Sequence, residues 1–237
     1  MASTTCDRRT VVTIVSTMRS GSTLLKALLA EADDISSLPE VNFQKYAGQD
    51  ARALIESLDD APIIVLKRPA WYHETSTYPR LPNVEPLKMI ALVRDAYETV
   101  TSLKKMTFRR AHRMVGNLAD RFLLSYWCKV VSTIADLSER TSAPLVRYED
   151  LVANPVTVTR GLFQYLESER IEGTDQYSAP SSYEWKWGKD DGGPRIRELR
   201  VLPPVPHGYK DRGLVEAIQR MQDVVELRQR LGYDDLA

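Results

Sequence analysis

A run of small polar residues with one arginine follows a strongly apolar stretch near the amino end of the chain. Residues 11–16 read Val-Val-Thr-Ile-Val-Ser, and residues 19–23 read Arg-Ser-Gly-Ser-Thr. Gly21 permits backbone angles that other residues resist, so a tight turn is expected here. A strand, a turn and a helix start aim backbone N–H groups at one point, and Arg19 adds a fixed cation. This pattern is suited to binding a phosphate or a sulfate group.

The same loop leaves two readings open when it is taken alone. It lacks the Gly-Lys-Ser/Thr ending of loops that bind a nucleoside triphosphate with magnesium. It would also fit an ordinary strand-to-helix turn that is capped by a serine. A second site is therefore needed to decide the chemistry.

A second strand-to-helix transition places another arginine and a serine at a suitable spacing. Residues 88–93 are apolar and typical of a buried strand, and Arg94 follows directly at its end. Ser102 comes eight residues later, two turns into the helix predicted for residues 96–106. An ordinary strand-end ion pair and an exposed helix serine are the alternatives.

Together these two stretches resemble the sulfotransferase family that uses 3′-phosphoadenosine-5′-phosphosulfate (PAPS). That family has a phosphosulfate loop, Arg/Lys-Ser-Gly-Ser/Thr-Thr, and a strand–Arg-Asp–helix–Ser motif for the 3′-phosphate. Residues 145–155, Leu-Val-Arg-Tyr-Glu-Asp-Leu-Val-Ala-Asn-Pro, are similar to a third segment of the family. Residues 185–191, Trp-Lys-Trp-Gly-Lys-Asp-Asp, are similar to a Trp- and Gly-rich segment in some bacterial members. The resemblance spans roughly residues 11–200, and the order of the motifs is more specific than any one of them.

The resemblance implies a role for each matching residue. Arg19 would neutralise charge on the bridging oxygen as the phosphate leaves, and Lys67 matches a family lysine near the sulfuryl group. Arg94 and Ser102 would bind the 3′-phosphate. The donors to the 5′-phosphosulfate would be Ser20, Gly21, Ser22, Thr23 and Leu24. No metal ion is implied at this loop.

The acceptor hydroxyl needs a general base, and the resemblance offers two candidates. Many members carry a histidine two residues beyond the Lys67 position, where this chain has Pro69. Other members use a glutamate after the first helix, and Glu40 in Pro-Glu-Val-Asn-Phe fits that pattern. Glu40 is the first choice, and His73, six residues after Lys67, is the second.

Apolar patterns predict the elements that position these residues. Strands are predicted at 11–16, 61–66, 88–93 and 143–146, the second one ending because Pro69 stops the ladder. Helices are predicted at 22–31, 50–59, 96–106, 115–139, 155–167 and 211–231. The core stripe of the 115–139 helix would be Leu118, Phe122, Tyr126, Val130 and Ile134. Residues 148–150 are expected to cap the next helix.

The alternation of strands and helices predicts an α/β fold with a central parallel sheet flanked by helices. In such sheets ligands bind beyond the carboxyl ends of the strands, where the polar motifs lie. The resemblance implies a P-loop NTPase-like sulfotransferase fold, and residues 1–237 are expected to form a single domain of this kind.

Residues 183–200 combine aromatic and basic side chains without a clear period. The basic residues are Lys186, Lys189, Arg195, Arg197 and Arg200, and the aromatic ones are Tyr183, Trp185 and Trp187. Such a segment could hold an adenine and a 3′-phosphate by stacking and charge. A solvated surface loop and a homodimer contact are the alternatives.

Composition excludes several classes of protein. Lys plus Arg and Asp plus Glu both number 32 among 237 residues, so the basic excess of a nucleic-acid binder is missing. The two cysteines, Cys6 and Cys128, form no disulfide or metal pattern. No run of about 18 apolar residues exists that could insert into a membrane, and the first ten residues lack the apolar core of a signal peptide. A cytoplasmic protein is expected.

The sequence thus predicts a bacterial-type sulfotransferase that moves the sulfuryl group of PAPS to a hydroxyl of a small-molecule acceptor. Adenosine 3′,5′-bisphosphate would be the second product. Residues 70–85 and 40–50 would shape the acceptor pocket. Two alternatives remain: a small-molecule kinase that needs ATP and Mg²⁺, and a non-catalytic nucleotide-binding module that needs no base.

Overall fold

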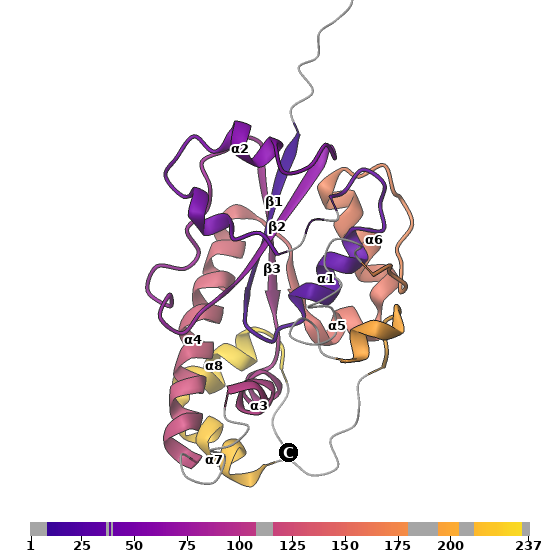
Figure 1. Ribbon diagram of the computed structural model, residues 1–237. Coiled ribbons are helices and arrows are strands. Elements are labelled where there is room, and N and C mark those ends of the chain that lie inside the picture. Colours follow the sequence, from indigo (N-terminus) through magenta and orange to yellow (C-terminus); the bar gives the residue numbers. More distant parts are fainter. Residues whose placement is uncertain are drawn as a thin grey trace, which may run out of the picture.

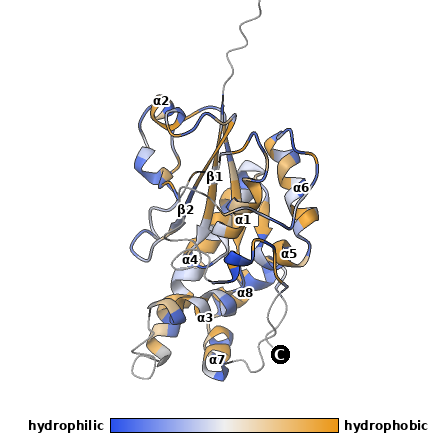
Figure 2. Cartoon of the chain, turned by 45° about the vertical axis from the view of Figure 1, so that its right-hand side comes forward, coloured by the Kyte–Doolittle hydropathy of each residue, from blue (hydrophilic) through white to orange (hydrophobic). Residues whose placement is uncertain are grey.

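Four parallel strands form the central sheet, in the order β2-β1-β3-β4 (Figure 1). The computed structural model describes residues 9–36, 38, 40–107, 116–179, 194–203 and 211–233. The strands are β1 (Thr10–Thr17), β2 (Ile63–Ala70), β3 (Leu87–Val93) and β4 (Leu145–Arg147). Most of their Val, Ile and Leu side chains are buried, on both faces, as parallel sheets covered by helices require. Figure 2 shows these strands as largely hydrophobic.

Helices cover both faces of the sheet and create two core clusters. One cluster joins the sheet to α3 (Ala96–Thr107), α4 (Gly116–Thr141), α7 (Arg212–Arg220) and α8 (Gln222–Arg230). The other joins it to α1 (Ser22–Leu29), α5 (Tyr148–Ala153) and α6 (Pro155–Leu166). The predicted α/β architecture is therefore confirmed. In the described part of the chain, the remaining elements are α2 (Arg52–Glu56) and the 3₁₀ turns Phe43–Tyr46 and Pro194–Glu198.

Strand β2 is longer than predicted, because Pro69 does not end it. The N–H groups of Ile63 and Val65 point away from β1, to the Asp34 carbonyl and the Ser36 hydroxyl. The two-residue period of a strand puts the nitrogen of Pro69 on this same outer side. A proline whose nitrogen faces outward from an edge strand removes no ladder bond, so β2 continues to Ala70.

Three further predictions about elements are wrong in detail. Residues 148–150 do not cap the following helix but form the first turn of α5, which ends before α6 begins. The helix predicted for 211–231 is two helices, because Met221 leaves the helical region with φ −103° and ψ 93°. In α4, Leu118 and Phe122 are 79% and 52% exposed, whereas Tyr126, Val130 and Ile134 are buried. Figure 1 shows the amino end of α4 extending past the carboxyl ends of the strands, beyond the reach of the sheet.

Within the residues that the structure describes, none of the helices has the length and apolar character needed to cross a bilayer.

Candidate active site

A cleft of about 590 Å³ lies where β1, β2, β3 and β4 end. The residue that follows each strand or ends it contributes to the walls, which is the expected place for a ligand in a parallel sheet. Of the predicted site residues, the cleft is lined by Arg19, Gly21, Ser22, Thr23, Leu24, Glu40, Lys67 and Arg94. The structure therefore brings most of them together.

The backbone conformation of the loop after β1 turns its N–H groups toward the cleft. Arg19 and Gly21 both have left-handed backbone angles, with φ of 65° and 93°. Gly21 is the N-cap residue of α1, no side chain caps this helix, and its first helical bond runs from the Leu25 N–H to the Gly21 carbonyl. The N–H groups of the first turn thus have no acceptor inside the helix, and this positive helix end is suited to an anion. A β-carbon at Gly21 would collide with the ring of Tyr148.

Ser20 differs from the other loop residues, because its side chain is turned inward. It is fully buried, and its hydroxyl donates a hydrogen bond of 2.8 Å to the Thr17 carbonyl. The Met18 N–H donates to the hydroxyl of Tyr126 at 2.9 Å. Both bonds fix the start of the loop, and Ser20 can offer its N–H but not its hydroxyl to a ligand.

The two arginine motifs meet at the ends of β1 and β3. Arg94 Nη1 donates to the Arg19 carbonyl at 3.1 Å, and Arg19 Nε donates to Ser102 Oγ at 3.0 Å. Ser102 does not line the cleft itself, but it holds the side chain of Arg19 there. The Arg94 guanidinium carbon lies 4.5 Å from the centre of the Tyr148 ring. Two guanidinium groups and a serine hydroxyl are therefore assembled within one wall.

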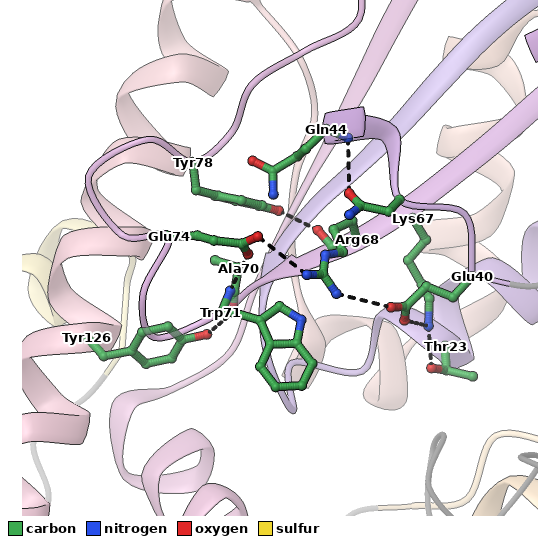
Figure 3. A network of polar contacts seen from close by, with 11 residues as sticks. Thr23, Glu40, Gln44, Lys67, Arg68, Ala70, Trp71, Glu74, Tyr78 and Tyr126 are labelled. Carbon is green, nitrogen blue, oxygen red and sulfur yellow. Dashed lines mark hydrogen bonds and ion pairs between the residues drawn. The ribbon is translucent and has the colours of Figure 1, made fainter. Parts of the chain in front are cut away.

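The end of β2 supplies the opposite wall, shown in Figure 3. The Lys67 side chain is only 2% exposed, and its Nζ donates to Thr23 Oγ1 at 2.7 Å. The same Nζ lies 3.1 Å from Glu40 Oε2. Lys67 thus joins the loop after β1 to the carboxylate that sequence reasoning selected as the base.

The segment before Glu40 meets the outer edge of β2 at Ile35 and Ser36. Ile35 forms a parallel bridge with Ile63, and the Ser36 N–H donates to the Ile63 carbonyl at 2.8 Å. Pro39, which directly precedes Glu40, lies outside the described residues.

His73 is placed differently from the other predicted residues. It is exposed and is not among the residues that line the cleft. The loop that carries it contributes Trp71 instead, which is 42% exposed and faces the cleft.

Sequence reasoning missed two residues of the site. Tyr148 was assigned to a helix cap, yet its ring packs against Gly21 and Arg94. Its position directly after β4 was the available signal, because all four strand ends meet here. Arg68, next to Lys67 in the sequence, was given no role, although its Nη1 lies 3.9 Å from Glu40 Oε1.

The carboxyl-terminal third contributes a further wall of the cleft. Arg195, Ile196, Arg200 and Tyr177 line it, and burial raises the pKa of Tyr177 to about 12, so its phenol is neutral. Lys186, Lys189, Tyr183, Trp185 and Trp187 lie outside the described residues, as does Cys6. Among the described residues no group of three or more His, Cys, Asp and Glu side chains is placed to hold a metal ion.

Comparisons with known proteins agree with this geometry. A family model described as "Sulfotransferase domain" matches residues 9–184. The sulfotransferase domain from the curacin biosynthetic pathway is similar, with a TM-score of 0.58, 21% identity, and coverage of 95% of this chain and 98% of that one. The sulfotransferase domain of the Synechococcus PCC 7002 olefin synthase is also similar, with a TM-score of 0.61, 18% identity, and coverage of 95% of this chain and 95% of that one.

A third solved structure, a sulfotransferase from Alicyclobacillus acidocaldarius, gives a TM-score of 0.55 at 13% identity, with 95% of this chain and 97% of that one covered. At these identities the likeness shows the fold, and it confirms the predicted sulfotransferase fold. A search of curated protein sequences gives no match.

Proposed function

Because the chain belongs to the sulfotransferase domain family, we propose that it is an enzyme that transfers the sulfuryl group of PAPS to a hydroxyl group of a small molecule. The observation that carries the choice of donor is the pairing of two anion sites in one cleft. The uncapped start of α1 is suited to the 5′-phosphosulfate. Arg94, which lines the same cleft at the end of β3, is suited to a second phosphate on the same nucleotide.

In the proposed complex the backbone N–H groups of residues 20–24 hold the 5′-phosphosulfate, with the hydroxyls of Ser22 and Thr23 beside them. Arg94 holds the 3′-phosphate. Ser102, which does not line the cleft, supports this site through its hydrogen bond with Arg19 Nε, and Tyr148 packs against the guanidinium of Arg94. Arg195 and Arg200, which line the same cleft, add positive charge for a nucleotide with several negative charges.

The transfer step needs one proton acceptor and a stabilised leaving group. The acceptor oxygen attacks sulfur, the bond between sulfur and the bridging oxygen breaks, and adenosine 3′,5′-bisphosphate leaves with that oxygen. Glu40 takes the proton of the hydroxyl, because its carboxylate faces the cleft and His73 does not. Lys67 and Arg19 stabilise the charge that develops on the departing phosphate. The acceptor enters on the side of Trp71 and Pro69.

We also propose that the whole chain, residues 1–237, is one sulfotransferase domain that works in the cytoplasm. The single-domain proposal is supported by α7 and α8. They follow the part of the chain matched by the family model, yet they pack into the same core cluster as α4 and the sheet.

Nucleotide binding tests the donor. We expect adenosine 3′,5′-bisphosphate to raise the melting temperature, whereas ADP with Mg²⁺ leaves it unchanged. Arg94→Ala is expected to weaken binding of the bisphosphate about 10-fold or more in calorimetric titration, since it removes charge-assisted hydrogen bonds. Arg52→Ala, which removes a cation from α2 away from the cleft, is the matched control. Equal stabilisation by ADP with Mg²⁺ would favour a kinase instead.

Turnover tests the reaction. A panel of alcohols is incubated with PAPS that carries labelled sulfur, and the label is followed into product. Glu40→Gln is expected to lower kcat by about 10²- to 10⁴-fold, the usual contribution of a general base. Tight binding of the bisphosphate without transfer to any alcohol would indicate a nucleotide-binding module.

A further inference from the structure

Arg68 has no part in the mechanism above, yet it lies at the centre of the contacts drawn in Figure 3. Its Nη1 is 3.9 Å from Glu40 Oε1, and its Nη2 is 3.4 Å from Glu74 Oε1. Its guanidinium carbon lies 5.3 Å from the centre of the Trp71 ring. Glu40 and Trp71 line the cleft, whereas Arg68 and Glu74 stand behind them.

Glu74 connects this arginine to the turn that carries Trp71. Its Oε2 accepts a hydrogen bond from the Trp71 N–H at 2.8 Å, while its Oε1 faces Arg68. The Glu74 N–H donates to the Trp71 carbonyl at 2.9 Å, which closes the turn. The position of the Trp71 wall therefore depends on a carboxylate that Arg68 holds.

Glu40 is held in a similar way, because its two oxygens face two different cations. Oε2 faces Lys67 and Oε1 faces Arg68, and these cations come from successive residues of one strand. Arg68 is itself anchored, since its carbonyl accepts a 2.8 Å hydrogen bond from Tyr78 and its side chain is only 16% exposed. A planar guanidinium can face two carboxylates at once, which a lysine ammonium does less well.

We propose that Arg68 is a positioning residue of the transfer step: it orients the carboxylate of Glu40 and, through Glu74, holds Trp71 as the acceptor-side wall. The inference rests on the proposed function, in which Glu40 takes the proton of the acceptor. Lys67 alone would fix one oxygen of Glu40 and leave the carboxylate plane free to turn. A base with a fixed orientation meets the acceptor proton in a productive geometry more often.

Steady-state kinetics of Arg68→Gln tests this role, with labelled PAPS as donor and 2-naphthol as a probe acceptor with a flat apolar body. We expect kcat to fall about 10-fold or more, since a small displacement of a reacting group has effects of this size. The dissociation constant of adenosine 3′,5′-bisphosphate is expected to stay within about 2-fold, because Arg68 does not line the cleft. Arg68→Lys is expected to restore part of kcat.

Two matched variants separate positioning from general damage. Glu74→Gln keeps an oxygen for the Trp71 N–H but removes the charge that faces Arg68, so kcat is expected to fall less than in Arg68→Gln. Arg220→Gln breaks an exposed pair of the same kind with Glu216 on α7, at 2.9 Å, and is expected to leave kcat unchanged. Parent kcat in Arg68→Gln would overturn the inference.

A double-mutant cycle with Glu40→Gln shows whether Arg68 acts through Glu40. We expect Arg68→Gln to reduce kcat much less in the Glu40→Gln background than in the parent, because there is no base left to orient. An equal loss in both backgrounds would overturn the inference and indicate a role in packing. If Glu40→Gln itself keeps the parent kcat, it is the proposed base that fails, which is a different result.

Amide hydrogen exchange gives a readout that needs neither donor nor acceptor. Exchange at residues 71–78 is expected to be faster in Arg68→Gln than in the parent and unchanged in Arg220→Gln, because the turn loses the partner of Glu74. Unchanged exchange in Arg68→Gln would overturn the role of Arg68 in holding Trp71, whatever the outcome of the turnover assays.

Discussion

The two walls of the cleft are built in different ways. The wall proposed to hold the nucleotide, here called the nucleotide wall, is made of Arg19, Arg94 and Tyr148, which lie directly after β1, β3 and β4, with Ser102 of α3 bonded to Arg19. The wall proposed for the acceptor, here called the acceptor wall, is made of Glu40, Lys67 and Trp71, with Arg68 behind them, and comes from an edge strand, the segment beside it and the loop after it. The first wall consists of local strand-to-helix turns, whereas the second depends on contacts between residues far apart in the sequence.

A second difference lies behind the two walls. The nucleotide wall is braced from behind by the end of the chain: Asp95, next to Arg94, accepts a 2.8 Å hydrogen bond from Arg228 Nε of α8. Its other oxygen accepts the N–H of Tyr97 at the start of α3. Behind the acceptor wall the support is smaller: the hydroxyl of Tyr78 donates a hydrogen bond to the Arg68 carbonyl. We therefore expect changes behind the nucleotide wall to have the larger effect on stability.

The largest effect is expected from Arg228→Met. Arg228 and Asp95 are 7% and 10% exposed, so removal of the cation leaves a buried carboxylate without its partner. Such a loss costs about 3–5 kcal/mol in the free energy of unfolding, measured by urea titration. The control is Arg230→Met, whose exposed pairs with Asp136 and Glu139 are worth about 0–1 kcal/mol. Similar values for the two variants would show that α8 does not brace the nucleotide wall.

The next effect is expected from Gly21→Ala in the nucleotide loop. The left-handed backbone costs a non-glycine residue about 1 kcal/mol or more, and the added carbon would also displace the Tyr148 ring, for a total of about 2–4 kcal/mol. Gly48→Ala is the matched control, since Gly48 has φ 71° and nothing within 4 Å of an added carbon. We expect only the Gly21 variant to weaken binding of adenosine 3′,5′-bisphosphate. An equal loss of unfolding free energy at both sites would mean that the Tyr148 ring moves aside at no cost.

The nucleotide wall could be predicted from sequence because its geometry is local. A buried strand, a glycine turn and a helix start fix where Arg19 and residues 20–24 must lie, and the same pattern fixes Arg94. The resemblance supplied the pairing of Arg94 with Ser102. Tyr148 was missed because a Tyr-Glu-Asp run after a strand is also typical of a helix cap, and no pattern reveals that its ring covers Gly21.

The acceptor wall could not be derived from pattern, because it depends on register and edges. The proline rule ended β2 too early, since only the three-dimensional order of strands shows that Pro69 faces outward. Glu40 was selected by resemblance alone, and no pattern in the sequence shows that it pairs with Lys67. In the same way, the helical period of α4 does not show that Phe122 is exposed.

Tyr78→Phe tests the brace of the acceptor wall. The Tyr78 hydroxyl accepts the Ser16 N–H at 2.7 Å and donates to the Arg68 carbonyl at 2.8 Å, and burial keeps it neutral by raising its pKa. Its loss leaves two buried backbone groups without partners, which costs about 1–3 kcal/mol in urea unfolding. Among the described residues the hydroxyl of Tyr46 has no partner, so Tyr46→Phe is the control. We expect Tyr78→Phe to lower kcat more than it weakens binding of the bisphosphate; the reverse pattern would contradict the division into two walls.

The smallest effect concerns pH and Glu149, which stands behind the nucleotide wall. Burial raises the pKa of Glu149 above its ordinary value, against the opposing effect of the hydrogen bond from the Asp95 N–H at 3.0 Å. A raised pKa in the folded state means that the folded chain keeps a proton which the unfolded chain has released. The stability from this proton is complete below the unfolded pKa of 4.5 and is lost as pH rises through the folded value.

Glu149→Gln removes this titration, so the difference in unfolding free energy between parent and variant is expected to fall from pH 4.5 to pH 7. The fall is about 1.4 kcal/mol for each unit by which the pKa is raised, and urea titrations at both pH values measure it.

Glu167→Gln is a control with the opposite sign. The Lys88 ammonium, 2.8 Å away, lowers the pKa of Glu167, which adds stability above pH 4.5 that is lost as pH falls. Because Glu149 touches Asp95 and Glu167 lies far along the exposed surface, only the first variant should also change the affinity for adenosine 3′,5′-bisphosphate. If the unfolding free energy changed with pH in the same direction for both variants, burial of Glu149 behind the nucleotide wall would not explain its titration.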